Sequence, residues 1–320
     1  MKAGNLVAAV LLACATFTSQ ADPFPEKPVR LVVGFAPGGN VDIVNRIVAQ
    51  AVSEELKQPF VVENKPGANG ALGATFVSRA AADGYTLLVA VTETHALNPN
   101  LHKNLPYDPL KDFTSIGIVG AFAYAFVINP NVPAADVNGF IAYAKRNPGK
   151  LNFSSWGNGS LSQIAMEQLK QSAEIDLLHV PFKGAAPAMA ALVTQTVHAF
   201  IAPLSLAVPY SADGRVKMIA VTSAKRQDVA PKVPTLIEQG IPVDIAGWNI
   251  WTAPAGTSKE IIAILNRALN AAILRPDVRE RLVKVGAQPA ASTPQEAQAM
   301  VESSFRRWGD VARKAGIRPD

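Results

Sequence analysis

Short apolar runs alternate with helical patterns along most of this chain. The runs that favour strands are Val29–Phe35, Tyr85–Val91, Tyr124–Ile128, Leu178–Phe182 and Met218–Thr222. Between them, apolar residues recur every three or four positions, as they do on one face of a helix. Strands that alternate with helices are typical of parallel sheets covered by helices, so the pattern predicts an α/β fold.

The first strand leads through Pro37, Gly38 and Gly39 into a strongly periodic segment, 42–56. Its apolar face consists of Val44, Ile47, Val48, Ala51, Val52 and Leu56. That spacing predicts a helix. Glycines let main-chain N–H groups approach a ligand closely, and the unpaired N–H groups of a helix start attract anions. The junction predicts a carboxylate or phosphate site; the alternative is a tight turn in which Asp42 caps the helix.

Two later junctions repeat this order of strand, small residues and helix. In the segment 151–160, Ser160 can cap a helix that carries Leu161, Ile164, Ala165 and Leu169 on one face, while Ser154, Ser155 and Asn158 offer hydrogen-bond donors. In the segment 180–187, Pro187 suits the first turn of another helix. Ligands of open α/β sheets bind at the carboxyl ends of strands, so we expect these loops to line one cleft.

The first residues predict export. Lys2 precedes an apolar run from Leu6 to about Ala15, and Ser19-Gln20-Ala21 supplies small residues for cleavage. We expect residues 1–21 to be a signal peptide and the mature chain to be periplasmic. The single cysteine, Cys14, lies within this signal, and its lipidation is the alternative interpretation. No later apolar run reaches the length of a membrane span.

Length and charge narrow the class of protein further. A mature chain of about 300 residues exceeds what one hydrophobic core usually serves, so we expect two domains. The net charge of +5 is mild, the basic residues are scattered, and no aromatic nucleic-acid motif occurs. The charge pattern therefore predicts no nucleic-acid partner.

Several further segments carry a family resemblance. They are Pro28–Asp42, Val62–Gly70, Asp83–Leu87, His95–Pro99, Leu105–Pro109, His179–Gly184, Ala220–Ser223, Val233–Thr235 and the stretch from Trp248 to Thr257. In order and spacing they resemble the substrate-binding proteins of tripartite tricarboxylate transporters, also called Bug proteins. The match runs along the whole mature chain.

This resemblance implies a two-lobe periplasmic binding protein fold of type II-like α/β architecture, with a ligand cleft between the lobes. It implies a small carboxylate as ligand and the subunits of a membrane transporter as partners. From the residues themselves we expect no cofactor and no metal. We expect a monomer. We also expect a discontinuous first lobe, 22–121 plus 225–320, and a second lobe, 122–224, joined by crossing strands at Tyr124–Ile128 and Met218–Thr222.

Carried over position by position, the ligand-gripping loops of the family correspond to Phe35–Asp42 and Ser154–Ser160, and three further loops complete the cleft. The predicted ligand-binding residues are Phe35, Ala36, Pro37, Gly38, Gly39, Asp42, Asn69, Thr92, His95, Ser154, Ser155, Asn158, Ser160, Phe182, Ala186 and Pro203. None of these loops contains an arginine, so we expect neutral donors to hold the carboxylate.

The chain also departs from the family pattern. Glu93 places an acidic residue near the expected cleft, and the segment 193–200 lacks the usual Gly and Asp. A ligand carboxylate beside Glu93 would be repelled, whereas an amine or amide could use it. Trp156 is interpreted either as a stacking surface for a ligand or as packing at the lobe edge.

Two other classes of function remain as alternatives. A periplasmic sensor would use the same cleft to signal rather than to transport. An exported hydrolase would need an activated nucleophile, yet no Gly-x-Ser-x-Gly elbow occurs. The four histidines are too widely spaced for a helical metal pair. The glycines of 67–73 lack dinucleotide spacing.

Overall fold

The computed structural model describes the backbone of residues 24–314 and the side chains of residues 24–311. Its strands are β1 (Val29–Val33), β2 (Phe60–Asn64), β3 (Thr86–Val91), β4 (Phe113–Ile128), β5 (Asn152–Ser155), β6 (Leu178–Pro181), β7 (Ala199–Pro203), β8 (Lys217–Val221), β9 (Ala246–Pro254) and β10 (Ala287–Pro289).

The α-helices are α1 (Asn40–Leu56), α2 (Ala71–Ser78), α3 (Asn98–Leu101), α4 (Val137–Arg146), α5 (Leu161–Ala173), α6 (Ala185–Val193), α7 (Leu204–Ala212), α8 (Lys259–Leu274), α9 (Pro276–Lys284) and α10 (Pro294–Lys314). Shorter helical turns are η1 (Ala68–Gly70), η2 (Glu93–Leu97) and η3 (Ile237–Gln239). The predicted alternation of strands and helices is confirmed.

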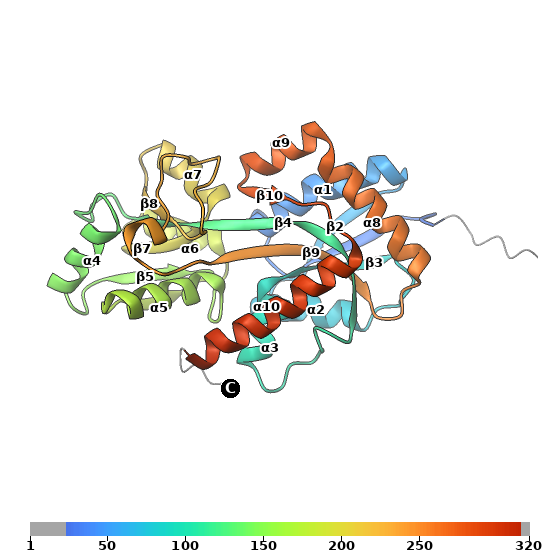
Figure 1. Cartoon of the computed structure of the whole chain (residues 1–320), viewed down its shortest axis with the longest axis horizontal. Coiled ribbons are helices and arrows are strands. Elements are labelled where there is room, and N and C mark those ends of the chain that lie inside the picture. Colours follow the sequence, from blue (N-terminus) through green and yellow to red (C-terminus); the bar gives the residue numbers. More distant parts are fainter. Residues whose placement is uncertain (1–23, 315–320) are drawn as a thin grey trace, which may run out of the picture.

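One long strand, β4, joins two halves of the molecule (Figure 1). Up to Ala123 it pairs antiparallel with β9 and β10, and from Tyr124 onward it pairs with β7 and β8. We call the half with β1, β2, β3, β9 and β10 the first lobe, and the half with β5 to β8 the second lobe. The chain has the predicted two-lobe α/β fold.

The apolar pattern predicted only the last part of β4, from Tyr124. Two glycines, Gly117 and Gly120, interrupt the earlier part, and the register with β9 shifts beside each of them. A Cβ at Gly120 would stand 2.7 Å from the carbonyl oxygen of Gln288, so a close approach of β10 requires glycine there. Glycine within a strand often marks such an irregularity, and it hides the strand from pattern analysis.

The core of the first lobe lies between its sheet and helices α1 and α8. Val44 and Val48 on the predicted apolar face of α1 pack with Leu31 of β1 and Leu269 of α8. Inside this core, the indole Nε1 of Trp251 donates a 2.7 Å hydrogen bond to Asn45 Oδ1. Burial of this face fixes α1 on the sheet and therefore positions its N-terminus.

The second lobe has its own core, in which Phe126, Phe140 and Phe153 are fully buried. Helix α5 begins at the residue that the sequence predicted, because the side chain of Ser160 accepts a hydrogen bond from the N–H of Gln163. Helix α4 is capped in the same way by Asp136. Both caps satisfy donors that a helix start otherwise leaves unpaired.

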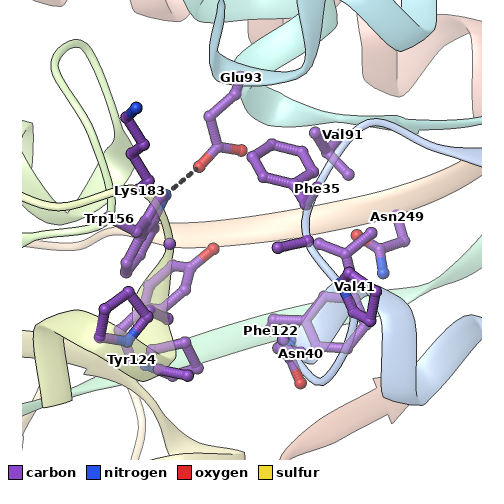
Figure 2. A pocket seen from close by; sticks show the side chains of 18 of the residues that line it. Phe35, Asn40, Val41, Val91, Glu93, Phe122, Tyr124, Trp156, Lys183 and Asn249 are labelled. Carbon is purple, nitrogen blue, oxygen red and sulfur yellow. Dashed lines mark hydrogen bonds between the residues drawn. The ribbon is translucent and has the colours of Figure 1, made fainter. Parts of the chain in front are cut away.

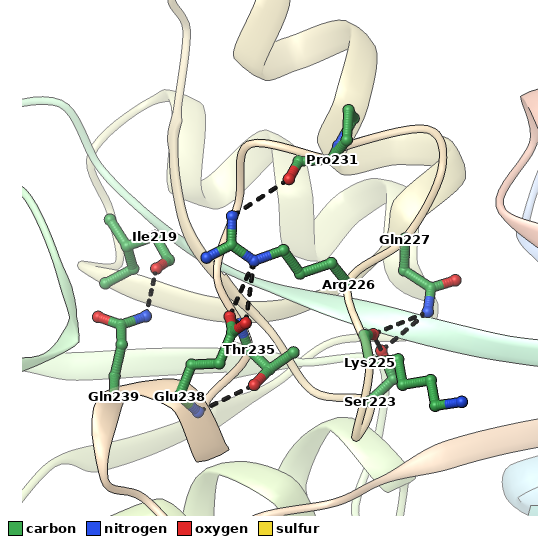
Figure 3. A network of polar contacts seen from close by, with 9 residues as sticks. All are labelled: Ile219, Ser223, Lys225, Arg226, Gln227, Pro231, Thr235, Glu238 and Gln239. Atoms are coloured by element: carbon green, nitrogen blue, oxygen red, sulfur yellow. Dashed lines mark hydrogen bonds and ion pairs between the residues drawn. The ribbon is translucent and has the colours of Figure 1, made fainter.

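The chain between β8 and β9, residues 222–245, stays with the second lobe (Figure 3). Arg226 Nε lies 3.0 Å from a carboxylate oxygen of Glu238, and Glu238 and Thr235 exchange two further hydrogen bonds. Gln239 Nε2 donates to the carbonyl oxygen of Ile219 in β8. The run 218–222 was therefore wrong as the second crossing, since the chain returns to the first lobe only through β9.

Helix α10 reaches both lobes. Its Val301 packs with Trp248 of β9 in the first lobe, and its Trp308 joins the core of the second. The predicted signal peptide, 1–21, and Cys14 lie outside the described residues. Within residues 24–314, no helix combines the length and the apolar character that a membrane span requires.

Candidate functional site

A pocket lies between the two lobes, at the ends of the strands that carry the predicted loops (Figure 2). It holds about 780 Å³ of unfilled space, counting the part open to solvent. Its lining comprises Phe35, Ala36, Pro37, Gly39, Asn40, Val41, Val91, Glu93, Phe122, Tyr124, Trp156, Lys183, Gly184, Ala185, Ala186, Pro187, Pro203, Trp248 and Asn249.

Predicted ligand residues from both lobes meet in this lining. They are Phe35, Ala36, Pro37 and Gly39 from the first lobe, and Ala186 and Pro203 from the second. Because a single cavity gathers them, the geometry permits the predicted cleft. Their contact with a ligand stays a prediction.

The first-lobe loop opens the start of α1 onto the pocket. Gly39 stands at the N-cap position in extended backbone, and no side chain caps the helix. The next two residues, Asn40 and Val41, line the pocket. The first N–H groups of a helix have no partner within the helix and carry the positive end of its dipole. This arrangement can accept a negatively charged group.

Two side-chain amides add unpaired polar atoms at the same end of the pocket. Asn249 of β9 is only 3% exposed, yet its Nδ2 has no hydrogen-bond partner. The buried Oδ1 of Asn40 is unpaired as well. Buried polar atoms are normally hydrogen-bonded. A donor left free inside a pocket is therefore a place for a ligand acceptor.

Asp42 stabilises the first loop and does not line the pocket. Its carboxylate accepts hydrogen bonds from the backbone N–H of Gly38 at 3.0 Å and from Asn64 at 2.8 Å, and it forms an ion pair with Arg46. Burial by itself would raise the pKa of Asp42, but these three partners outweigh it and hold the pKa below its ordinary value. The carboxylate therefore fastens Gly38, whose φ of +78° favours glycine.

The second-lobe loop differs, because its side chains are already engaged. Ser154 Oγ donates to the carbonyl oxygen of Ala188, and Ser155 Oγ lies 2.7 Å from Nε2 of His179. Ser160 caps α5, and Asn158 is exposed to solvent. None of these four predicted residues belongs to the pocket lining in the described part of the chain.

The remaining predicted residues have structural partners as well. Thr92 Oγ1 accepts a hydrogen bond from the N–H of Trp248. Asn69 Nδ2 donates to the carbonyl oxygen of Gly159 at 3.2 Å, which links the two lobes. Phe182 packs on the core of the second lobe. These positions lie around the pocket rather than in its wall.

His95 is buried deep in the first lobe. It is 1% exposed, its Nδ1 lies 2.9 Å from Thr94 Oγ1, and its ring centroid lies 4.8 Å from that of Phe113. Burial lowers the pKa of His95 to about 3, so the ring is neutral at physiological pH.

Glu93 is the acidic side chain in the pocket lining, and it reaches across to the second lobe. It is 5% exposed, and its Oε1 accepts a 3.2 Å hydrogen bond from Nε1 of Trp156. The backbone N–H of Leu161, at the start of α5, also donates to it. Burial raises the pKa of Glu93 above its ordinary value, and the hydrogen bonds from its own backbone N–H, Trp156 and Leu161 oppose this only in part.

Aromatic side chains form much of the wall, and sequence reasoning missed most of them. Tyr124 and Trp156 lie with ring centroids 5.3 Å apart, and Phe122 and Trp248 complete the surface. The acidic character of Glu93 and the presence of Trp156 were visible in the sequence. Phe122, Trp248 and Asn249 lie on the crossing strands, where only the strand register brings them to the pocket.

The site contains no evident metal ligands. Among the described residues, no group of His, Cys, Asp and Glu side chains is arranged to hold a metal ion. Lys183 is the basic side chain of the lining; it is exposed, and in Figure 2 its ammonium points away from the middle of the pocket.

Comparison with known proteins places this chain in a family. Residues 44–317 match the family model described as the tripartite tricarboxylate transporter family receptor. Protein BugT of Bordetella pertussis is 33% identical over 302 residues, which cover 93% of this chain and 92% of BugT.

Two solved structures of Rhodopseudomonas palustris proteins are similar throughout. One, determined with adipate, is 33% identical with a TM-score of 0.90 and covers 93% of this chain and 100% of its own. The other, MatC with bound malate, is 35% identical with a TM-score of 0.84 and covers 90% of this chain and 99% of its own. The chain therefore belongs to the tripartite tricarboxylate transporter receptor family, whose members are periplasmic solute-binding proteins.

Proposed function

We propose that this protein captures a small carboxylate in the pocket between its lobes and delivers it to a membrane transporter of the tripartite tricarboxylate type. The observation that carries the proposal is the open start of α1 beside the unpaired Nδ2 of Asn249. The solved relatives with adipate and malate bind carboxylates in the same fold.

Neutral donors suffice for useful affinity. A hydrogen bond to a charged group contributes about 1.5–3 kcal/mol, and a micromolar dissociation constant corresponds to about 8 kcal/mol. Three to five such bonds from the first turn of α1 and from Asn249 would meet that requirement. The carboxylate is therefore proposed to bind at the first lobe.

The cellular setting is part of the proposal. Residues 1–21 act as a cleaved signal, the mature receptor works in the periplasm as a monomer, and the ligand is released unchanged rather than turned over. The sensor alternative predicts altered transcription, whereas transport predicts lost uptake, when the gene is deleted.

Closure of the cleft is expected to accompany binding, because groups from both lobes line one pocket. The lobe bounds stay a prediction. The packing of Leu236 and Ile241 with Phe126 supports moving the second bound from residue 224 toward residue 245.

The test is direct binding of carboxylates to the purified mature protein. Calorimetry on ligand-stripped protein is expected to give saturable binding of a small carboxylate, and the recovered ligand is expected to be chemically unchanged. A folded protein that binds no carboxylate, or that releases an altered product, would contradict the proposal.

A further inference from the structure

The carboxylate of Glu93 stands at the opposite end of the pocket from the start of α1. In Figure 2, Glu93 lies near the top of the view with its carboxylate toward Trp156 on the left, and Asn249 and Val41 lie on the right. Glu93 comes from η2 of the first lobe and accepts a hydrogen bond from its own backbone N–H, whereas two further donors, Trp156 and Leu161, belong to the second lobe. The pocket therefore has two chemically different ends, one rich in free donors and one that carries the carboxyl group of Glu93.

Glu93 already uses a backbone donor of the second lobe that could otherwise bind a ligand carboxylate. The N–H of Leu161 is one of the first donors of α5. The neighbouring donors are also used, since the N–H of Gln163 bonds to Ser160 and the N–H of Gly159 bonds to Gln163 Oε1. A carboxylate end of a ligand finds few free donors there and meets the carboxyl group of Glu93.

The surroundings of Glu93 leave its charge only partly compensated. Three N–H donors reach it, its own backbone N–H and those of Trp156 and Leu161, although a carboxylate offers about four acceptor sites. The ammonium of Lys183 points away from the pocket centre. The raised pKa of Glu93 reflects this burial, and a cation placed beside the carboxylate would favour its ionised form.

The walls next to Glu93 also suit a cation. The ring of Trp156 lies beside Glu93, and Tyr124 packs against it. Aromatic faces attract ammonium groups, most strongly where water is excluded. An aromatic surface and a buried carboxylate at one end of a pocket therefore form a recognition surface for a protonated amine.

We propose that the ligand is an amino carboxylate, whose carboxylate binds at α1 and Asn249 and whose ammonium binds Glu93 between the aromatic walls. Binding of the ligand carboxylate at α1 is part of the proposed function. Binding of the ligand ammonium is inferred separately, from Glu93 and the aromatic walls beside it. A dicarboxylate would bring its second carboxylate against Glu93, and two such groups in one site cannot both remain ionised without cost. This chain would thus differ in ligand class from its adipate- and malate-bound relatives.

The experiment compares ligands of equal length by calorimetry on ligand-stripped mature protein. One set is ε-aminocaproate, adipate, caproate and hexylamine; a shorter set is γ-aminobutyrate, succinate, butyrate and butylamine. In at least one set, the amino carboxylate should bind more tightly than the dicarboxylate by about tenfold or more. Glu93→Gln, which keeps the size and an acceptor for Trp156, should reverse that preference.

Two further variants control for indirect effects. Glu93→Asp keeps the charge and should retain a preference for the amino carboxylate. Glu280→Gln removes an exposed carboxylate that pairs with Lys284 on α9, and it should leave the preference unchanged. Thermal unfolding of each variant shows whether it is folded.

The outcomes separate this inference from the proposed function. The inference is overturned if the dicarboxylate binds more tightly than the amino carboxylate in both sets, or if Glu93→Gln leaves the preference unaltered. Either result still supports a carboxylate receptor. Amines that bind only while Glu93 is present, with no binding of any carboxylate, support the Glu93 subsite and overturn the proposed function. Binding of none of the eight compounds overturns both.

Discussion

The loop before α1 and the loop before α5 have the same order in sequence: a strand, small residues, then a helix. In the structure they differ in which hydrogen-bond donors at the helix start remain unpaired. Helix α1 begins at Gly39 with no side-chain cap, and the unpaired Nδ2 of Asn249 lines the same pocket. Helix α5 begins at Ser160 with a side-chain cap, and Glu93 accepts from its first N–H.

This difference teaches that a loop of small residues at a helix start is a ligand site only where its donors remain free. The same residue types stabilise the fold when neighbouring side chains use those donors. Two loops with the same sequence pattern can therefore have different roles: the first binds the ligand, and the second stabilises the second lobe.

The largest effect is expected from filling the first loop. Gly39→Leu should abolish measurable binding with little loss of stability, because the backbone at Gly39 is extended and a Cβ there meets only Ala36 at 3.6 Å. Calorimetry and thermal unfolding measure the two effects. The same side chain placed in the second loop, Asn158→Leu, should leave binding intact. Equal losses in both variants would show that both loops grip the ligand.

Removal of the free amide donor should have the next largest effect. Asn249→Ala should weaken carboxylate binding by about 1.5–3 kcal/mol, roughly ten- to a hundredfold, since its Nδ2 has no other partner. Titration calorimetry gives the affinity. If the variant binds as tightly as the parent protein, the carboxylate lies elsewhere in the pocket.

Removal of the cap in the second loop should affect stability instead. Ser160→Ala should lower the free energy of unfolding by about 1 kcal/mol through loss of the bond from Gln163. Its carboxylate affinity should stay within about threefold of the parent value. Urea unfolding and calorimetry report the two quantities. A large loss of affinity at unchanged stability would reverse the roles of the loops.

Acid should loosen the first loop through Asp42. Its folded pKa lies below the ordinary value of 3.8, so its stabilising effect is complete above that value and is lost as the pH falls toward the folded pKa. Asp42→Asn should lack this part of the acid destabilisation in urea unfolding at a series of acidic pH values. Ser160→Ala should keep it, and identical pH profiles for both variants would contradict the assignment.

The smallest effect is expected at Lys183. Because its ammonium is exposed and points away from the pocket centre, Lys183→Ala should change carboxylate affinity by less than about twofold. Loss of nearly all affinity in this variant would show that a cation, rather than neutral donors, holds the ligand.

The sequence by itself determined the local elements. The apolar face of 42–56 predicted α1 to within two residues of its start, and Ser160 predicted the cap of α5. Spacing of apolar residues and the chemistry of caps act over a few residues, so one chain segment contains the information. The resemblance along the chain also led to the correct family.

Only the tertiary structure decided which residues meet at the pocket. Phe122 and Asn249 come together because β4 and β9 pair in one register, and the glycines of β4 concealed that strand. Likewise, the Ser154–Ser160 loop has the composition of a ligand site, but whether its donors are free depends on Glu93, Gln163 and His179. Hydrogen bonds between residues far apart in the chain are set by packing, which no local pattern encodes.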